Sequence, residues 1–211
     1  MTRYFEITTS CITFIIMDFI YPNDRAPQIP PAKGKLLIAA PFLSDPDFSR
    51  SVVFLCEHGE EGTMGFILNQ PSALTLGDLL TDQLLFMPPL AIYQGGPVQP
   101  DTLHILHRMP EVLGGMPVAP GVYWGGSYET LKEIAREGNY KEQDLRLFMG
   151  YSGWSEGQLD REMTENSWLV GAATEQLLFE TEPHLVWKQA ISSLGSNYSF
   201  LANMPIDPQL N

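Results

Sequence analysis

Runs of apolar residues separated by short polar turns predict a series of β-strands in the first half of this chain. Three runs lie at residues 35–43, 51–58 and 62–71, and a fourth at 90–108 is broken by a Gly-Gly-Pro turn. Runs this rich in Val, Ile, Leu and Phe are typical of strands covered on both faces. A short leucine-rich helix is expected between them, at residues 74–84.

Helices and strands are interleaved in the second half. Residues 121–139 predict a strand and then a helix, with Ser127 as the N-cap and Gly138 as the residue that ends it. The other expected elements are a strand at 144–154 and helices at 156–168 and 182–195. No repeat or linker divides this pattern, so we expect an α+β fold, a single compact domain around a large mixed β-sheet with interleaved helices.

The N-terminal region has a different composition from the rest of the chain. Residues 21–33 hold four prolines and little periodicity, which is typical of an irregular lead-in arm. Met17 stands just ahead of this arm, so residues 1–16 are interpreted as an upstream extension. We therefore assign residues 1–33 to an extension with a Pro-rich arm and residues 34–211 to the α+β domain.

Charge and cysteine content narrow the class of protein. The chain carries 25 Asp and Glu against 12 Lys and Arg, a net charge of −13. Nucleic-acid surfaces need clustered Lys and Arg, so direct nucleic-acid binding is not expected. The apolar stretch 11–20 is interrupted by Asp18 and is shorter than the roughly 20 residues that cross a bilayer. Two cysteines, Cys11 and Cys56, indicate a reducing compartment, and we expect a cytoplasmic protein.

One stretch has the form of a hydrolase nucleophile motif. Residues 153–157 read Gly-Trp-Ser-Glu-Gly, which matches G-x-S-x-G between an expected strand and an expected helix. His184 follows in the chain with acidic residues in between, so a serine hydrolase using Ser155 and His184 is one alternative. Ser155 and Gln158 also form the S-x-x-Q pattern of a capping box at a helix start, which is the interpretation we favour.

Thiol or metal chemistry has weaker support. Cys56 and His58 are two residues apart on an expected strand, so they would share a face and could form a reactive pair, although a buried inert thiol is the simpler interpretation. His104 and His107 are three apart on a strand and face opposite sides, so they cannot bind one metal ion together. We expect neither a metal nor a cofactor, and the chain is more readily interpreted as a non-enzyme.

Two turns could bind a small anion. The loop around Asp45 and Arg50 concentrates polar groups between apolar strands, and Arg50 could hold a carboxylate or phosphate through paired hydrogen bonds. The Gly95-Gly96 turn could offer backbone N–H groups to the same ligand, although a tight turn is the simpler interpretation. The binding candidates are Asp45, Arg50, Asn69, Gly95, Gly96, Tyr151 and Trp154.

Several stretches together resemble the YqgE/AlgH family of bacterial proteins. They lie at residues 34–71, 93–108, 121–131 and 147–169. The family pattern G-Y-x-G-W-x-x-G-Q-L matches Gly150, Tyr151, Gly153, Trp154, Gly157, Gln158 and Leu159. Ser155 occupies a free position of that pattern, so the resemblance does not require a serine there.

The resemblance implies a compact cytoplasmic α+β protein with a large mixed sheet and no accepted enzymatic activity. One family member is labelled a transcriptional regulator of alginate synthesis. Since this chain is acidic, we expect any regulation to act through a protein partner or a small ligand and not through DNA. A regulatory or adaptor protein is therefore the preferred function; a serine hydrolase and a binding module for an anionic metabolite are the alternatives.

Overall fold

The computed structural model describes residues 29–43, 45–80 and 89–204. The chain divides into two units, Met1–Pro30 and Pro31–Asn211. Every helix and strand given below belongs to the second unit. The predicted upstream extension lies outside the described residues.

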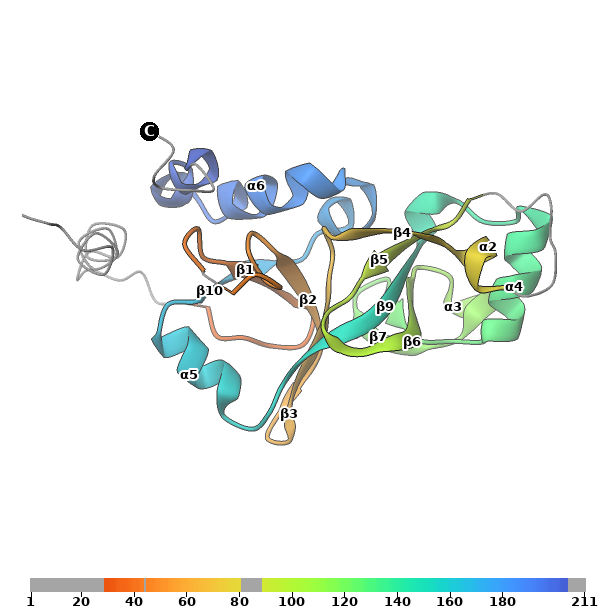
Figure 1. The fold of residues 1–211 in the computed structure, drawn as a ribbon, viewed down its shortest axis with the longest axis horizontal. Coiled ribbons are helices and arrows are strands. Elements are labelled where there is room, and N and C mark those ends of the chain that lie inside the picture. Colours follow the sequence, from red (N-terminus) through yellow and green to blue (C-terminus); the bar gives the residue numbers. More distant parts are fainter. Residues whose placement is uncertain (1–28, 44, 81–88, 205–211) are drawn as a thin grey trace, which may run out of the picture. The chain divides into compact units, whose positions relative to one another are not determined.

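Ten strands form one sheet. Their bounds are Lys35–Ala39 (β1), Val52–Gly59 (β2), Gly62–Ile67 (β3), Pro71–Thr75 (β4), Ala91–Gln94 (β5), Val98–His107 (β6), Met116–Ala119 (β7), Val122–Trp124 (β8), Leu145–Trp154 (β9) and Trp168–Ala172 (β10). The order is β10-β1-β2-β3-β9-β6-β8-β7, and β5 pairs with both β4 and β9 (Figure 1). Because β5 and β9 run parallel and the other pairs antiparallel, the sheet is mixed, as the sequence predicts.

Short helices connect and cover the strands. They are Leu76–Leu79 (α2), Pro110–Leu113 (α3), Tyr128–Glu137 (α4), Gln158–Thr164 (α5) and Pro183–Ser193 (α6), with 3₁₀ turns at Glu142–Asp144 (η1), Ser196–Tyr198 (η3) and Leu201–Asn203 (η4) and a π-helical turn at Gln176–Glu180 (η2). The predicted ends of α4 are confirmed, because the Ser127 hydroxyl accepts the Thr130 N–H and Gly138 adopts a left-handed φ of 69°. Among the described residues, no helix is both long and apolar enough to cross a membrane.

Two segments differ from the sequence expectation. The helix expected at 156–168 ends at Thr164, since Asn166 adopts a left-handed φ of 57° and the chain then extends into β10. β10 is a strand because it pairs along its whole length with β1, from Trp168 opposite Ala39 to Ala172 opposite Lys35. Similarly, the helix expected at 74–84 begins only at Leu76, because Pro71–Thr75 forms β4 and pairs with β5.

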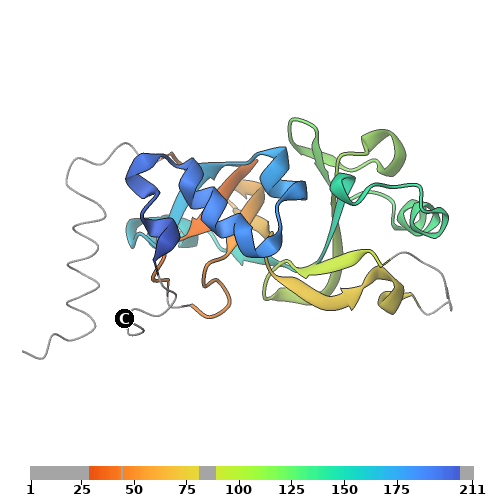
Figure 2. The ribbon, with the colours of Figure 1, turned by 90° about the horizontal axis from the view of Figure 1, so that it is seen from above.

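The β10-β1-β2-β3 part of the sheet is covered on both faces. On one face α5 packs Leu159 into a core with Leu37 and Trp168. On the other face α6 lies across the strands, and the Trp187 indole N–H donates to the Ala39 carbonyl at 2.8 Å. Figures 1 and 2 show the two helices on opposite sides of these strands. The prediction that the apolar runs are doubly covered strands is confirmed for β1 and β2.

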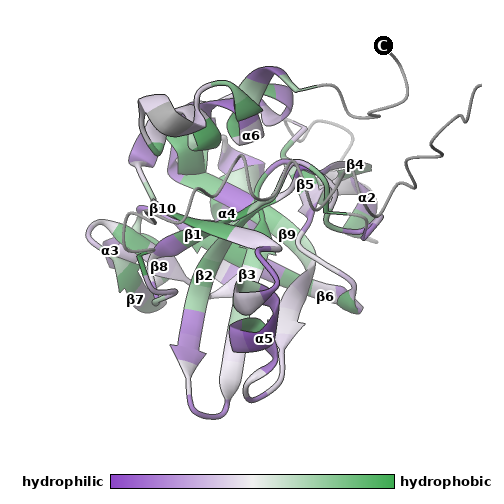
Figure 3. Ribbon diagram, turned by 90° about the vertical axis from the view of Figure 1, so that its left-hand side faces the viewer, coloured by the Kyte–Doolittle hydropathy of each residue, from purple (hydrophilic) through white to green (hydrophobic). Residues whose placement is uncertain are grey.

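A second hydrophobic core lies beneath the remaining helices. Its buried members are Leu76, Leu90, Ile92, Ile105, Leu113, Leu131, Ile134, Ala135, Leu145 and Leu147. The long strand β9 enters both parts of the sheet, because it pairs with β5 and β6 near its start and with β3 at its end. The strands are hydrophobic where the helices cover them and hydrophilic at the β2–β3 hairpin tip (Figure 3).

Candidate functional site

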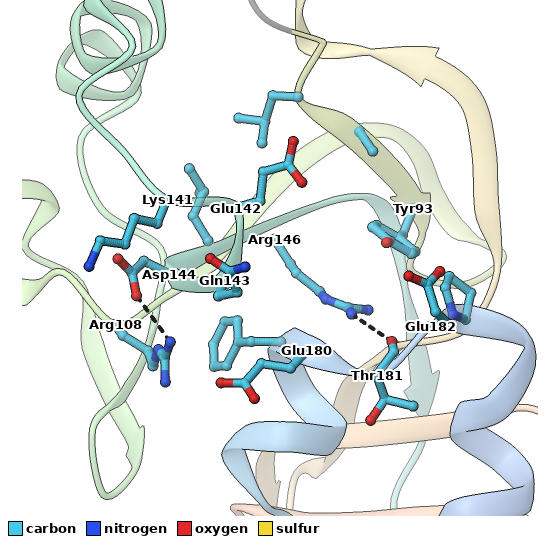
Figure 4. Close-up of a pocket in the computed structure, with 15 residues that line it drawn as sticks. Tyr93, Arg108, Lys141, Glu142, Gln143, Asp144, Arg146, Glu180, Thr181 and Glu182 are labelled. Carbon is cyan, nitrogen blue, oxygen red and sulfur yellow. Dashed lines mark hydrogen bonds and ion pairs between the residues drawn. The ribbon is translucent and has the colours of Figure 1, made fainter.

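A cleft of about 640 Å³ opens at the start of β9. Four parts of the chain line it: β5, the residue after β6, the η1 turn with the first residues of β9, and the turn from η2 into α6. Figure 4 shows Arg146 in this cleft between Tyr93 and the turn that carries Thr181. A volume of this size suits a small ligand.

Arg146 is a buried cation within the sheet. Alternation along β9 turns Leu145 and Leu147 into the second core and Arg146 to the opposite side of the strand. Its side chain is only 6% exposed, and its guanidinium donates to the Leu68 carbonyl at 2.9 Å and to the Thr181 carbonyl at 3.3 Å. The guanidinium carbon also lies 4.7 Å from the centre of the Tyr93 ring.

No carboxylate of the described residues forms an ion pair with Arg146 within 4.0 Å. Burial lowers the pKa of Arg146, while Tyr93 and Glu182 act in the opposite direction. An arginine stays protonated in proteins, so the charge persists in the buried site. Two carbonyl groups and an aromatic ring satisfy only part of a guanidinium that carries five N–H donors.

Arg108 in the same cleft provides a contrast. It pairs with Asp144 at 3.0 Å and with Glu175 at 2.6 Å, and it lies over the Phe179 ring. Its charge is therefore neutralised by the protein itself. Arg146 is more buried than Arg108 and has no such partner, which makes it the group most in need of a ligand.

The cleft also has an acidic rim. Glu142, Glu180 and Glu182 are exposed and line the opening, together with Lys141. A large polyanion would be repelled by these carboxylates, whereas a small anion could reach Arg146. Amino or hydroxyl groups on the same ligand could donate to the rim.

Sequence reasoning missed Arg146. The available signal was a single charge inside the apolar run of residues 145–149, which reads Leu-Arg-Leu-Phe-Met. The groups that enclose Arg146 come from the end of β3 and from the turn before α6, far away in the chain. Only the folded sheet brings them together.

Ser155 occupies an exposed turn after β9. Both its backbone N–H and its hydroxyl donate to the Gln158 side-chain oxygen, at 3.1 and 3.2 Å. The Gln158 half of the expected capping box is thus present. The helix nevertheless begins at Gln158 with Gly157 as its N-cap, since Gly157 adopts a left-handed φ of 66°.

The structure does not bring Ser155 and His184 together. Ser155 leads into α5, and the exposed His184 lies in the first turn of α6. These helices cover opposite faces of the sheet (Figure 1). A hydrolase serine needs a histidine within hydrogen-bond reach, and this pair does not supply it.

Cys56 and His58 do not form a reactive thiolate–imidazole pair. Cys56 is fully buried. It lies at a β-bulge, since Leu55 pairs with Gly65 and Glu57 pairs with the next residue, Met64. Burial raises the pKa of the Cys56 thiol, so the reactive thiolate is disfavoured. The ring of His58 is hydrogen-bonded to the Thr63 hydroxyl at 2.8 Å.

The loop that carries Asp45 and Arg50 is held by internal bonds. The Asp45 carboxylate accepts the Asp47 N–H at 2.9 Å in a local turn. Arg50 adopts a left-handed φ of 52°, and its guanidinium donates to the Met204 carbonyl and lies 4.3 Å from the Trp187 ring centre.

Asn69 fastens this loop to the end of β3. Its side-chain oxygen accepts the Val52 N–H and its amide donates to the Arg50 carbonyl, both at 2.9 Å. Both ends of the Asn69 amide are therefore engaged with the backbone of the loop that precedes β2.

The backbone of the Gly95-Gly96 turn packs directly against the backbone of β9. The Gly95 N–H donates to the Met149 carbonyl, and the Gly95 carbonyl accepts the Ser152 hydroxyl at 3.0 Å. A Cβ at Gly95 would collide with the Gly150 carbonyl oxygen. This crossing accounts for the two glycines. It lies at a 300 Å³ cavity lined by Asp47 and Gly96 but not by Arg50, so the proposed pair of Arg50 and the glycine turn is not brought together.

Tyr151 and Trp154 have different environments. Trp154 is 5% exposed and donates its indole N–H to the Glu162 carboxylate at 2.9 Å, so it belongs to the core. Tyr151 is half-buried and lines a third cavity, of about 630 Å³, together with His104 and Trp124. Within the described residues, no group of three or more His, Cys, Asp or Glu side chains could hold a metal ion.

Comparison with known sequences identifies the family. The sequence profile described as AlgH-like matches residues 36–199. The chain belongs to the AlgH-like family. It is 40% identical over 181 residues to a UPF0301 protein of Cytophaga hutchinsonii, covering 85% of this chain and 98% of the relative. It is 41% identical over 179 residues to a UPF0301 protein of Chlorobaculum tepidum, covering 84% and 95%.

Solved structures agree with this assignment. The solution structure of AlgH from Pseudomonas aeruginosa, a UPF0301 protein, has 33% sequence identity and a TM-score of 0.65, covering 84% of this chain and 97% of that one. A crystal structure of a Corynebacterium diphtheriae protein has a TM-score of 0.69 at 23% identity, covering 84% and 94%, which shows a shared fold. The resemblance inferred from the motifs is confirmed, and no molecular function is established for the family.

Gly150, Trp154, Gly157 and Leu159 of the family pattern have structural roles in this member. Gly150 allows the Gly95-Gly96 crossing, Trp154 and Leu159 enter the core, and Gly157 caps α5. Tyr151, Gly153 and Trp154 line the cavity of about 630 Å³.

Proposed function

We propose that this protein is a non-enzymatic regulatory protein of the cytoplasm that binds a small anionic ligand at Arg146. One observation carries the proposal: a guanidinium that is 6% exposed lines an open cleft and has no carboxylate partner among the described residues. A buried charge without a counter-charge is costly, and a bound carboxylate or phosphate would remove that cost through a charge-assisted hydrogen bond.

The cleft also limits the kind of ligand. Its volume of about 640 Å³ fits a metabolite, and its acidic rim disfavours polyanions such as nucleic acid. Glu182, whose charge acts on Arg146 from beyond ion-pair distance, would interact with a donor group of the ligand. We therefore expect one carboxylate or phosphate accompanied by amino or hydroxyl groups.

A thermal-unfolding screen tests the proposal. The probes are succinate, glutamate, inorganic phosphate and phosphoserine, which vary the anionic group with and without an amino group. A ligand at 100 times its dissociation constant adds about 2.7 kcal/mol of stability. We expect at least one probe to stabilise the protein, and isothermal titration to give one site per chain.

Matched variants locate the site. Arg146→Met removes the cation from the cleft, while Arg161→Met removes one exposed cation from α5, which does not line it. Binding should be lost in the first variant and kept in the second. Arg146→Lys retains the positive charge but lacks the planar guanidinium that can form two parallel hydrogen bonds to a carboxylate or phosphate. This variant should therefore bind the anion more weakly while preserving the fold. Stabilisation that survives Arg146→Met, or no response to any probe, would refute the proposal.

A further inference from the structure

A second concave surface lies near the other end of β9, and its walls are aromatic. His104, Trp124 and Tyr151 line it, with ring centres 6.2 Å apart for His104 and Trp124 and 5.9 Å apart for His104 and Tyr151. We call this surface, together with Glu57 and Glu61, the aromatic groove. Its volume is about 630 Å³.

The aromatic side chains of the groove are partly exposed. Trp124 and Tyr151 are only half-buried, and neither side chain has a hydrogen bond from its N–H or hydroxyl to any described residue. Nε2 of His104 is hydrogen-bonded to the Thr102 hydroxyl at 3.0 Å. Burial lowers the pKa of His104, which favours the neutral ring.

The carboxylates that line the groove belong to Glu57 and Glu61. Glu57 and Glu61 extend from the hydrophilic β2–β3 hairpin (Figure 3), and neither forms an ion pair with the described residues. Among the residues that the structure describes, no Lys or Arg lines the groove. Aromatic faces beside unpaired carboxylates favour a cation, and a planar guanidinium can stack on a ring while it donates to a carboxylate.

We propose that the aromatic groove receives an arginine-bearing segment of a partner protein. Charge complementarity supports a protein partner, because the chain carries a net charge of −13 that would steer a basic surface toward it. The groove is formed by a different set of residues from the Arg146 cleft. The inference therefore does not depend on the ligand proposed for that cleft.

The test uses the full chain and a synthetic probe. The probe is an acetylated, amidated peptide with two arginines separated by glycine, and its control contains citrulline, which has nearly the same shape without the charge. We expect the arginine peptide to shift the NMR signals of the Trp124 indole N–H, the His104 ring and Tyr151. The citrulline peptide should leave them unchanged at the same millimolar concentration.

Two double variants with the same net charge distinguish attraction of the peptide by the groove carboxylates from attraction by the net charge of the protein. Glu57→Gln with Glu61→Gln removes both carboxylates of the groove. Glu111→Gln with Glu133→Gln removes the same charge from exposed positions that do not line it. Affinity for the arginine peptide should fall about tenfold in the first variant, as expected for loss of a rim charge contribution, and stay close to wild type in the second.

Four results would overturn the inference. They are equal binding of both peptides, equal effects of the two double variants, no shifts in the groove, and shifts confined to the acidic rim of the Arg146 cleft. Methylguanidinium that bound as tightly as the peptide would assign the groove to a small cation instead. Arg146→Met should leave peptide binding unchanged, so failure of either proposal can be recognised separately.

Discussion

Trp154 and Trp168 donate their indole N–H groups to the same carboxylate oxygen, Oε2 of Glu162, at 2.9 and 2.8 Å. Their rings meet edge to face with centres 5.7 Å apart. Gln158 donates to the other oxygen of Glu162 at 3.0 Å. Glu162 thus joins the end of β9 to α5 and to the start of β10 through charge-assisted bonds.

Removing the Glu162 carboxylate should destabilise the fold. Glu162→Ala leaves two buried indole donors without an acceptor, so the free energy of unfolding should fall by about 2–4 kcal/mol. Glu162→Gln keeps one acceptor oxygen and should lose less. Urea unfolding followed by tryptophan fluorescence measures both values. Ser155→Ala, whose hydroxyl is exposed, is the control and should change stability by less than about 0.5 kcal/mol.

The Gly95 crossing should tolerate no side chain. A Cβ at Gly95 would meet the Gly150 carbonyl oxygen and also the Phe66 ring at 3.0 Å, so Gly95→Ala should cost about 2–4 kcal/mol of stability. Gly59→Ala is the matched control, because nothing lies within 4 Å of a Cβ there. Equal denaturation midpoints for the two variants would show that the crossing can relax.

The buried thiol of Cys56 should make the protein less stable in alkali. Burial raises its pKa in the folded protein, so above about pH 8.5 the unfolded chain releases this proton while the folded chain keeps it. Stability should then fall with pH by up to about 1.4 kcal/mol per pH unit. In Cys56→Ala this contribution is absent. Urea unfolding of both proteins from pH 7 to 10 should give diverging curves, and parallel curves would contradict the assignment.

Ser155 should not react as a hydrolase nucleophile. Its hydroxyl donates to Gln158, and the sheet separates it from His184, so His184 does not act as its general base. Incubation with a fluorophosphonate, followed by intact-mass measurement, should give no adduct. An adduct that disappears in Ser155→Ala would establish a nucleophile and contradict the non-enzymatic proposal.

The features that sequence could predict are those decided by neighbouring residues. The ends of α4 follow from Ser127 and Gly138, each acting within one helical turn, and β1 and β2 follow from continuous apolar runs. By contrast, the sequence analysis assigns no strand to residues 168–172, and it places Trp168 at the end of a helix. β10 is defined by its pairing with β1, which is distant in the chain and is not visible in the local sequence.

The candidate site was harder to predict for the same reason. Arg50 looked free to bind an anion, but Trp187 and Met204, far along the chain, contact its guanidinium, and it does not line any of the three cavities described above. Arg146 looked like an incidental charge in a strand, but the fold buries it beside an open cleft. Whether an arginine lines an open cleft, and whether a carboxylate pairs with it, depends on segments that only the tertiary structure brings near it.

The pairing of β1 with β10 also has a consequence for synthesis. β1 emerges from the ribosome before the other strands described here, whereas one of its two neighbours, β10, is made after all of them. Until then, the edge of β1 that β10 will cover displays unpaired backbone groups on an apolar strand. During most of translation the nascent chain therefore exposes a strand edge that could pair with other chains, and the sheet is complete only after β10 has been made.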